Sequence, residues 1–423
     1  MSKFLDEKAR ESGTRFLIYP QNKNLIGFEK PEVVYINLVP GSIKAGPEDD
    51  KMYVVDAKNK HEYMYEFEGP PYKGPRFPAV EPDKEGHFDY IDPSSREFSS
   101  TIMYATVRRV LEIWEDYFGH SIEWYFREKF PRLELIPRVE WDNAHSGYGF
   151  VEFGFGRTLD NRHIDHDNPY CENFDVLAHE IGHTIKNSII GIPNKNEYTP
   201  EYSGHHEAFG DLVAIVSVLH FDSVVDHILN NTKGNLFSVN ELSRMGELSQ
   251  SREIRMAFND KKMSDVGAEE HDLSEPFTGG AFDILVEIFE RNLIERVLIS
   301  EDLGKRSYHA KGENELKNIQ NEFEEHYRGK ENEFKEALLD ARDYFGKLMA
   351  KAWSNITPNK LTYGKVLNNI IKADQELSGG KYKETILDCF DWREIMPSSD
   401  NSRTLLSTHI VDELNEENEL VLV

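Results

Sequence analysis

The sequence predicts an α+β fold in two parts, a β-rich domain over residues 1–172 and a mainly helical domain over residues 173–423. Near the amino terminus, short runs of β-branched and aromatic residues bounded by Pro and Gly are typical of strands. After residue 173, apolar residues recur at intervals of three and four, as amphipathic helices require. At 423 residues the chain is long enough to bury two cores.

The first domain is predicted to contain strands, a loop and one long helix. The early strand-like runs are residues 16–19, 33–39, 52–55 and 63–67. Residues 69–97 are rich in Pro, Gly and Asp, which predicts a long surface loop. Residues 99–118 place apolar side chains on one helical face and are followed by Gly119, a residue that commonly ends helices. A further strand is expected at 138–141.

The next helix carries the motif His-Glu-x-x-His, with His179 and His183 four residues apart and Glu180 directly after the first histidine. Residues at this spacing share one helical face, so the two imidazoles can bind one zinc ion with Glu180 beside them. Apolar residues repeat on the other side, at Leu177, Ile181 and Ile185. The motif is short, and a helix that carries two histidines by chance is the alternative interpretation.

A third ligand is predicted downstream, because catalytic zinc usually has three protein ligands and one open position. Glu207 and Asp211 again stand four residues apart, and an apolar run follows them. A carboxylate in such a setting is costly unless it is paired or metal-bound. We therefore expect Glu207 to bind the metal and Asp211 to accept a hydrogen bond from a ligand histidine. Two solvated acids on an amphipathic helix would fit the apolar run poorly.

Other segments agree in order and rough spacing with one known family. They are an Asn-Ala segment with its following strand at 142–154, a His-x-x-Ser segment and helix at 271–282, and late helices at 341–358. With the zinc motif, these segments resemble the thermolysin-like zinc metallopeptidases, which are gluzincins, over roughly residues 100–390. The resemblance implies a zinc site in a cleft between the two domains.

The resemblance also implies where a substrate would lie. Asn143 and Ala144 match positions that hold the substrate backbone, and Val176 matches the lining of a specificity pocket. The implied activity is that of a zinc-dependent endopeptidase acting on peptides or proteins, with a preference for a bulky apolar residue after the scissile bond. Most members of the family are exported with a long pro-segment, which this chain lacks room for.

Further site residues are implied by the resemblance. His271 is expected to stabilise the oxyanion of the tetrahedral intermediate. A substrate-gripping arginine is best matched by Arg244, with Arg252 and Arg255 as alternatives. The family tyrosine is matched by Tyr198 or Tyr202, and the sequence does not choose between them.

In this scheme Glu180 is the general base, which takes a proton from the attacking water and delivers it to the leaving amine. The alternative function is a zinc-binding protein of the same fold with narrow or lost proteolytic activity, which would act by binding partners. Glu180 argues against it, because a structural zinc site needs no base and closes its fourth position. The Gly-x-Met-Glu-Asn segment of aminopeptidase-type gluzincins is absent.

Composition limits the partners. A net charge of −27 repels nucleic acid and anionic membranes, so we expect neither as a partner. Cys171 and Cys389 are too few for a disulfide framework. The amino terminus shows no signal-peptide pattern, which predicts a cytoplasmic protein, with non-classical export left open. The oligomeric state is also left open.

Two histidine pairs are given structural interpretations. Residues 157–172 contain His163 and His166, for which a polar loop is preferred over a second metal pair. His205 and His206 precede Glu207 and could line the cleft, although the three-ligand site does not need them.

A calcium site beside the zinc helix is predicted to be absent. Asp175 and Asp226 match two calcium-ligand positions of exported relatives. Val218 stands where those relatives have the central acid of the calcium site, and a valine cannot bind a metal.

The second domain is predicted to hold helices at 280–293, 334–353 and 360–377. Residues 300–338 are dense in Glu and Lys and have no counterpart in the family. A solvated helical hairpin is the preferred interpretation of this charged insertion, and an arm for a partner or a lid is the alternative.

Overall fold

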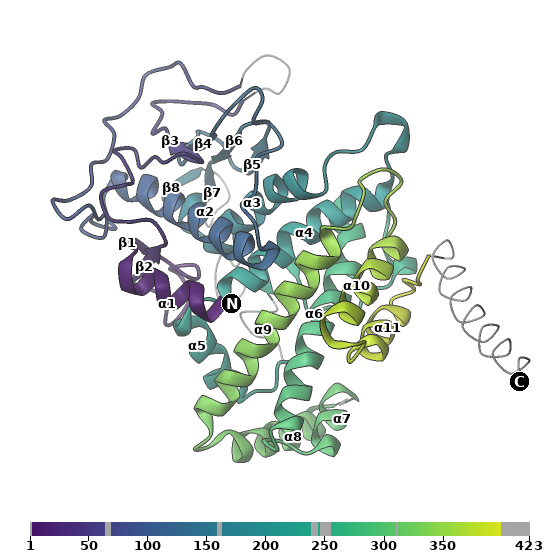
Figure 1. The fold of residues 1–423 in the computed structure, drawn as a ribbon. Coiled ribbons are helices and arrows are strands. Elements are labelled where there is room, and N and C mark those ends of the chain that lie inside the picture. Colours follow the sequence, from purple (N-terminus) through teal and green to yellow (C-terminus); the bar gives the residue numbers. More distant parts are fainter. Residues whose placement is uncertain are drawn as a thin grey trace, which may run out of the picture.

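The structure is a computed structural model that describes residues 2–63, 69–158, 163–237, 244–245, 255–309 and 312–398. It confirms a mixed α+β fold: most strands precede residue 170, and helices dominate the rest of the described chain (Figure 1). The expected strand at 63–67 falls almost wholly outside the described residues.

The amino-terminal segment forms a helix and a small sheet. Helix α1 (Ser2–Ser12), which the sequence analysis did not predict, is followed by β1 (Thr14–Ile18) and β2 (Glu32–Ile36). The two strands are antiparallel, and β1 buries every second side chain, as a strand with one face on a core must.

A four-stranded sheet supports the candidate site. Its strands are β3 (Met52–Val54), β4 (Leu133–Ile136), β6 (Phe150–Phe153) and β5 (Ala144–Gly147), in that spatial order. The first three are parallel, and β5 is an antiparallel edge strand. The strand predicted at 138–141 is wrong, because the regular strand is β4. Pro137 follows β4 and has no N–H to donate to a ladder.

The polar loop predicted at 157–172 is also wrong in part. Strands β7 (Phe155–Arg157) and β8 (Ile164–Pro169) form a hairpin, and the short 3-10 helix η1 (Tyr170–Glu172) follows. Only one of the six residues of β8 is buried, so this strand tolerates a polar sequence that resembles a loop. His166 contacts Glu140 at 3.0 Å, and neither His163 nor His166 joins a metal-type ligand group among the described residues.

The long helix α2 (Arg96–Phe118) is surrounded by other elements, including β1, α3, α4 and α9. The sequence predicted one apolar face, but the helix is buried on nearly all sides. Its polar residues are paired inside the protein: Arg108 lies 3.2 Å from Asp49, and Glu112 accepts hydrogen bonds from the backbone of Asn37. These ion pairs and hydrogen bonds offset the free-energy cost of burying charged side chains.

Three helices carry most of the candidate site, and α4 packs between the other two (Figure 1). They are α3 (Phe174–Ile189), α4 (Pro200–Val218) and α6 (Glu270–Glu295). Side-chain caps define where each begins: Asn173, Thr199 and Glu269 accept hydrogen bonds from the first backbone N–H groups. The helix predicted at 280–293 therefore begins earlier, at Glu270.

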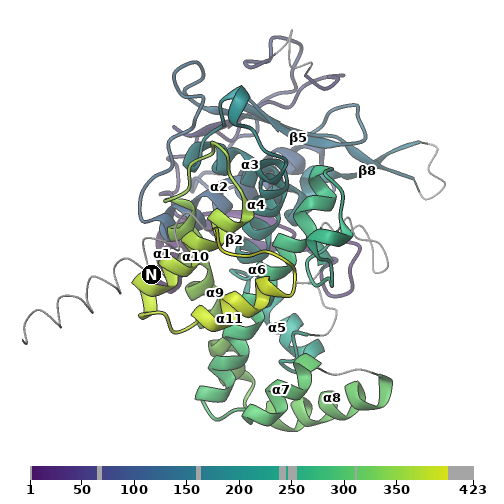
Figure 2. The same ribbon diagram turned by 90° about the vertical axis from the view of Figure 1, so that its right-hand side faces the viewer.

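The charged insertion is a helical hairpin, as predicted. Helices α7 (Glu301–His309) and α8 (Glu313–Tyr327) lie at the end of the molecule furthest from the four-stranded sheet in both views (Figures 1 and 2). Arg306 of α7 joins the two helices through an ion pair with Glu322 of α8, and it also pairs with Asp302 within α7. Whether the hairpin serves a partner stays untested.

The remaining helices are α5 (Asp222–Thr232), α9 (Glu331–Trp353), α10 (Tyr363–Ser378) and α11 (Lys383–Asp391). The last two expected helices, at 334–353 and 360–377, thus correspond to α9 and α10. Helix α9 packs against both α2 and α6, and α11 lies against α6. The larger of two hydrophobic clusters among the described residues extends from Leu5 to Ile395 and runs through these helices.

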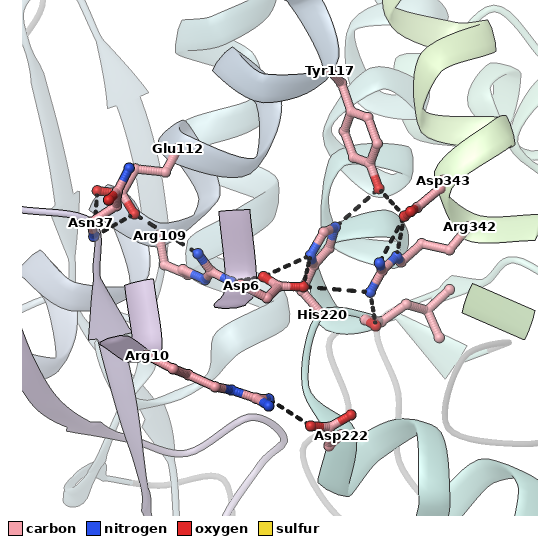
Figure 3. A network of polar contacts seen from close by, with 11 residues as sticks. Asp6, Arg10, Asn37, Arg109, Glu112, Tyr117, His220, Asp222, Arg342 and Asp343 are labelled. Carbon is pink, nitrogen blue, oxygen red and sulfur yellow. Dashed lines mark hydrogen bonds and ion pairs between the residues drawn. The ribbon is translucent and has the colours of Figure 1, made fainter. Parts of the chain in front are cut away.

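A buried polar cluster around Asp6 connects α1 to three distant helices (Figure 3). Asp6 contacts Arg109 of α2, Nδ1 of His220 just beyond α4 (3.1 Å) and Arg342 of α9 (4.0 Å). Burial lowers the pKa of His220 to about 4. Burial acts to raise the pKa of Asp6, but its cationic neighbours and His220 outweigh burial and hold that pKa well below its usual range.

Cys171 and Cys389 are free and buried, as the sequence indicated. Burial raises the pKa of both thiols.

Over the described ranges, no single helix is long and apolar enough to cross a membrane. Only α4 and α5 taken together pass on length and composition, and they are bent by 92°.

Candidate metal centre

The centre of the site is formed by two histidines of α3 and one glutamate of α4. His179 Nε2 lies 3.3 Å from one carboxylate oxygen of Glu207, and His183 Nε2 lies 3.6 Å from the other. The two imidazole rings are nearly perpendicular, with an interplanar angle of 85° and centroids 4.5 Å apart. The two histidines of α3 thus face the same carboxylate group of Glu207, one towards each of its oxygens.

These separations fit a tetrahedral zinc ion. Two donor atoms held about 2.0–2.2 Å from a tetrahedral centre are themselves about 3.3–3.6 Å apart. The distances from Glu207 to His179 and His183 fall in this range. Two imidazoles and a carboxylate also form one of the ligand sets that catalytic zinc uses. The residues present therefore fit the metal that the sequence predicts.

Asp211 lies behind the site, on the same face of α4 as Glu207. Its Oδ1 is 2.9 Å from His179 Nδ1, and Thr278 of α6 donates a hydrogen bond to its Oδ2 (3.4 Å). The side chain of Asp211 is 1% exposed. A carboxylate at this nitrogen favours the tautomer whose Nε2 lone pair faces the metal position.

Glu180 stands at the more open side of the group. The ligand-type atoms of His179, Glu180 and His183 all lie within 4.8 Å of one another. Glu180 is partly exposed, whereas Glu207 is buried. This difference in exposure suits a group that must exchange protons with water and substrate.

His271 lies in the first turn of α6, half exposed, with its Nε2 3.3 Å from Glu207. Its Nδ1 contacts Glu269 at 2.7 Å. Glu207, Glu270 and His271 form a second group of closely spaced metal-type ligands. The structure therefore brings His271 to the edge of the site, within reach of the same carboxylate that faces the two ligand histidines.

The two candidate tyrosines have different environments. Tyr198 is 55% exposed, and its hydroxyl contacts the Ser203 hydroxyl. Tyr202 is buried, and its hydroxyl donates to the carbonyl oxygen of Gly191 at the end of α3 (3.1 Å). Because Tyr198 is exposed and Tyr202 is buried, a substrate could reach Tyr198 but not Tyr202.

The expected substrate-binding segment lies beside the zinc helix. Strand β5 contacts α3 and forms an edge of the four-stranded sheet, with Ala144 as its first residue. Asn143 is exposed directly before it. Val176, in the first turn of α3, is partly buried against the main core.

The arginine predictions lie largely outside what is described. Arg244 and Arg255 belong to the short paired strands β9 (Arg244–Met245) and β10 (Arg255–Met256), whose backbone alone is placed for these two arginines. Arg252 lies outside the described residues. Which arginine faces the site stays a prediction.

The calcium-related residues are placed as follows. Val218 is buried in the core at the end of α4, and Asp175 is buried at the start of α3. Asp226 pairs with Lys335 at 2.8 Å, on the outer side of α5. Val218 thus lies in a dry helix contact, and the absence of a calcium site stays a prediction.

Sequence reasoning missed Lys186 and gave no role to His206. Lys186 is fully buried on α3, where its Nζ donates to the carbonyl oxygen of Tyr202 (3.1 Å). Burial lowers its pKa well below the usual range, and Glu207 offsets this only in part. His206 is half-buried with its ring stacked on that of His183, and desolvation lowers its pKa too. A lysine three residues after His183 in an apolar helix was the available sequence signal.

Comparison with known proteins adds little to these observations. No protein-family model matches the sequence, and no curated protein matches it. Among solved structures, the precursor of protealysin, a metalloproteinase from Serratia proteamaculans, resembles this chain with a TM-score of 0.48 and 11% sequence identity. The match covers 85% of this chain and 91% of that chain. At a likeness this distant, the chemistry of the site has to be inferred from its own residues.

Proposed function

We propose that this protein is a zinc-dependent endopeptidase that hydrolyses peptide bonds with an activated water. The observation that carries the proposal is the convergence of His179, His183 and Glu207 at separations suited to a tetrahedral ion. Glu180 in the same group supplies a base that a purely structural zinc site would not need.

The roles of the side chains follow from their positions. Zinc held by His179, His183 and Glu207 would supply Lewis-acid polarisation of a water and of the peptide carbonyl. Glu180 accepts a proton from the water while the water oxygen attacks the carbonyl carbon. Glu180 then passes that proton to the leaving amine. His271 donates a hydrogen bond to the oxyanion of the tetrahedral intermediate.

Substrate binding is proposed at the exposed edge of β5. An extended peptide can add to an edge strand through backbone hydrogen bonds, and Asn143 and Ala144 lie at the start of this edge. The contact between β5 and α3 would bring such a peptide beside the base Glu180. We further propose peptide or protein substrates, with a bulky apolar residue near Val176, and neither nucleic acid nor membrane as partner.

A second candidate function is a zinc-binding protein with narrow or lost proteolysis. One observation favours it: His271 Nε2 lies as close to Glu207 as His179 Nε2 does, at 3.3 Å. A histidine there could close the fourth position of the ion, as structural sites do. The half exposure of His271 favours the endopeptidase, because an exposed side chain is free to meet a substrate.

The test combines metal analysis with cleavage of a peptide library. The proposal expects about one zinc per chain, cleavage that stops with a zinc chelator and cleavage that returns when zinc is restored. Protein that binds zinc but cleaves no peptide would favour the second function. Cleavage that survives complete removal of metal would refute the endopeptidase mechanism.

A further inference from the structure

Each of the two candidate ligand histidines of α3 contacts a side chain of α4. His179 Nδ1 lies 2.9 Å from Asp211. The His183 ring lies flat against that of His206: the two rings are 13° from parallel, with centroids 4.1 Å apart. The two residues lie on different helices, α3 and α4, and His206 directly precedes Glu207.

The stack continues beyond His206. The ring of Tyr202, one turn earlier on α4, lies 19° from parallel to the His206 ring, with centroids 6.3 Å apart. Residues four apart share a helical face, so α4 presents these two rings in one row. His183, His206 and Tyr202, called here the ring stack, thus form one row with His206 in the middle.

Helix α3 holds the far end of the ring stack as well. The Tyr202 hydroxyl donates to the carbonyl oxygen of Gly191 (3.1 Å) and to Asn187 (3.3 Å). Lys186 Nζ lies 3.5 Å from the centre of the Tyr202 ring and donates to its backbone carbonyl. Both ends of the ring stack are therefore attached to the helix that carries the zinc motif.

Rings pack on both faces of the middle ring, His206. The Nδ1 atom of His206 is buried and has no hydrogen-bond partner among the described residues. The neighbouring His205 is also buried, but its ring packs against Phe209 and Phe277, away from His183. The orientation of His206 is thus set by the two rings on either side of it.

We propose that His206, supported by Tyr202, is a positioning residue that fixes the imidazole of His183 for metal binding. The inference rests on the proposed function only in that the site binds zinc. It assigns Tyr202 to the support of a ligand and leaves the exposed Tyr198 for the substrate. Groups that orient a metal ligand commonly change metal affinity by about 10–100-fold when removed.

The test compares four variants with the natural protein: His206→Phe, His206→Leu, Tyr202→Phe and the control His205→Leu. Phe keeps a flat ring, whereas Leu fills similar volume without one. Zinc affinity is measured by competition with a chelator, and site geometry by the visible spectrum of the cobalt-substituted protein. We expect about 10–100-fold weaker zinc binding for His206→Leu, near-natural binding for His206→Phe, and little effect of His205→Leu.

Equal zinc affinity for His206→Leu and the natural protein would overturn the proposal. So would an equal loss for Phe and Leu, because the ring nitrogens and not the stack would then matter. If the natural protein binds no zinc, the proposed function fails, and the ring stack is then tested by NMR without metal. The His183 ring protons should show a ring-current shift that His206→Leu abolishes and His206→Phe retains, and an unchanged shift in the Leu variant refutes the stack.

Discussion

Gly182 of α3 and Gly210 of α4 lie so close together that a Cβ atom on Gly182 would be 2.9 Å from the Cα atom of Gly210. Contacts under 3 Å are essentially absent for real Cβ atoms, so the two helix backbones can approach this closely only through glycine. The crossing point lies within one turn of both His179 and Glu207. The separation of the candidate ligands His179 and Glu207 therefore depends on two glycines that lie outside the proposed site.

Gly210→Ala should weaken zinc binding, because the new Cβ would lie 2.8 Å from His179 Nδ1, the atom that Asp211 holds. We expect an affinity loss of about 10–100-fold and a fall of about 1–3 kcal/mol in the free energy of unfolding. Chelator competition and urea unfolding measure the two effects. Gly69→Ala, at a site with open space around it, is the matched control and should change neither. Natural zinc affinity in Gly210→Ala would show that the close crossing is irrelevant to the ligands.

Glu180→Gln should retain zinc and the fold but lose peptidase activity. The amide cannot accept the proton of the attacking water, and a general base contributes about 10²–10⁴-fold to the rate. The matched control is Glu207→Gln, which should instead lower zinc content, because Glu207 faces both ligand histidines. Atomic emission and a peptide-cleavage assay separate the two effects. Near-natural turnover by the Glu180 variant would exclude it as the base.

His271→Ala distinguishes the two proposed functions. If His271 stabilises the oxyanion, kcat/KM should fall by about 10²–10³ while zinc affinity stays unchanged. If His271 closes the fourth position of the ion, the same change should weaken zinc binding itself. Replacement of Glu269, which contacts His271 Nδ1 at 2.7 Å, by Gln should produce a smaller effect of the same kind. A variant with full activity and full zinc affinity would remove His271 from both schemes.

His220→Gln should reduce the loss of the free energy of unfolding that occurs as the pH is lowered. Burial lowers the pKa of His220 from 6.5 to about 4. Between these pH values the unfolded chain binds a proton that the folded protein does not bind, so stability falls as the pH is lowered. The full difference corresponds to about 3 kcal/mol. Urea unfolding between pH 7 and 4 should show this slope in the natural protein and in the exposed-site control His120→Gln, but not in His220→Gln.

Lys186→Met should stabilise the protein at neutral pH without removing the metal. Because burial lowers the pKa of Lys186, the unfolded chain binds a proton below pH 10.5 that the folded protein rejects. The stability of the natural protein should therefore fall as the pH is lowered from 10 towards 7, and methionine removes this dependence. We expect a gain of about 1–3 kcal/mol at pH 7, measured by urea unfolding with zinc affinity as the second readout. A less stable variant would show that the lysine hydrogen bond to Tyr202 outweighs the cost of burial.

The sequence correctly predicted which residues share a face of the same helix. His179, Glu180 and His183 share one face of one helix, and so do Glu207 and Asp211, because four-residue spacing decides this locally. Apolar residues at helical spacing predicted α2, and the density of Glu and Lys predicted the hairpin of α7 and α8. Polar strand β8 was missed because only one of its six residues is buried, so it carries no alternating apolar pattern.

Contacts between helices were not predictable in this way. The ring stack joins His183 to residues of α4, and no spacing along the chain indicates which faces of two helices meet. The burial of Arg108 and Glu112 around α2 depends likewise on partners far along the chain, namely Asp49 and the backbone of Asn37. Tertiary packing, and not local pattern, decides the environment of such residues.

The cluster around Asp6 has a consequence for the order of events during protein synthesis. Arg342 lies 336 residues after Asp6, so at about 5–20 residues per second it leaves the ribosome about 20–70 s later. Until then, the carboxylate of Asp6 lacks one of its cationic neighbours, and His220 has only part of its final surroundings. The first helix to be made should thus be among the last to dock, and nascent chains halted before Arg342 should leave α1 open to proteases.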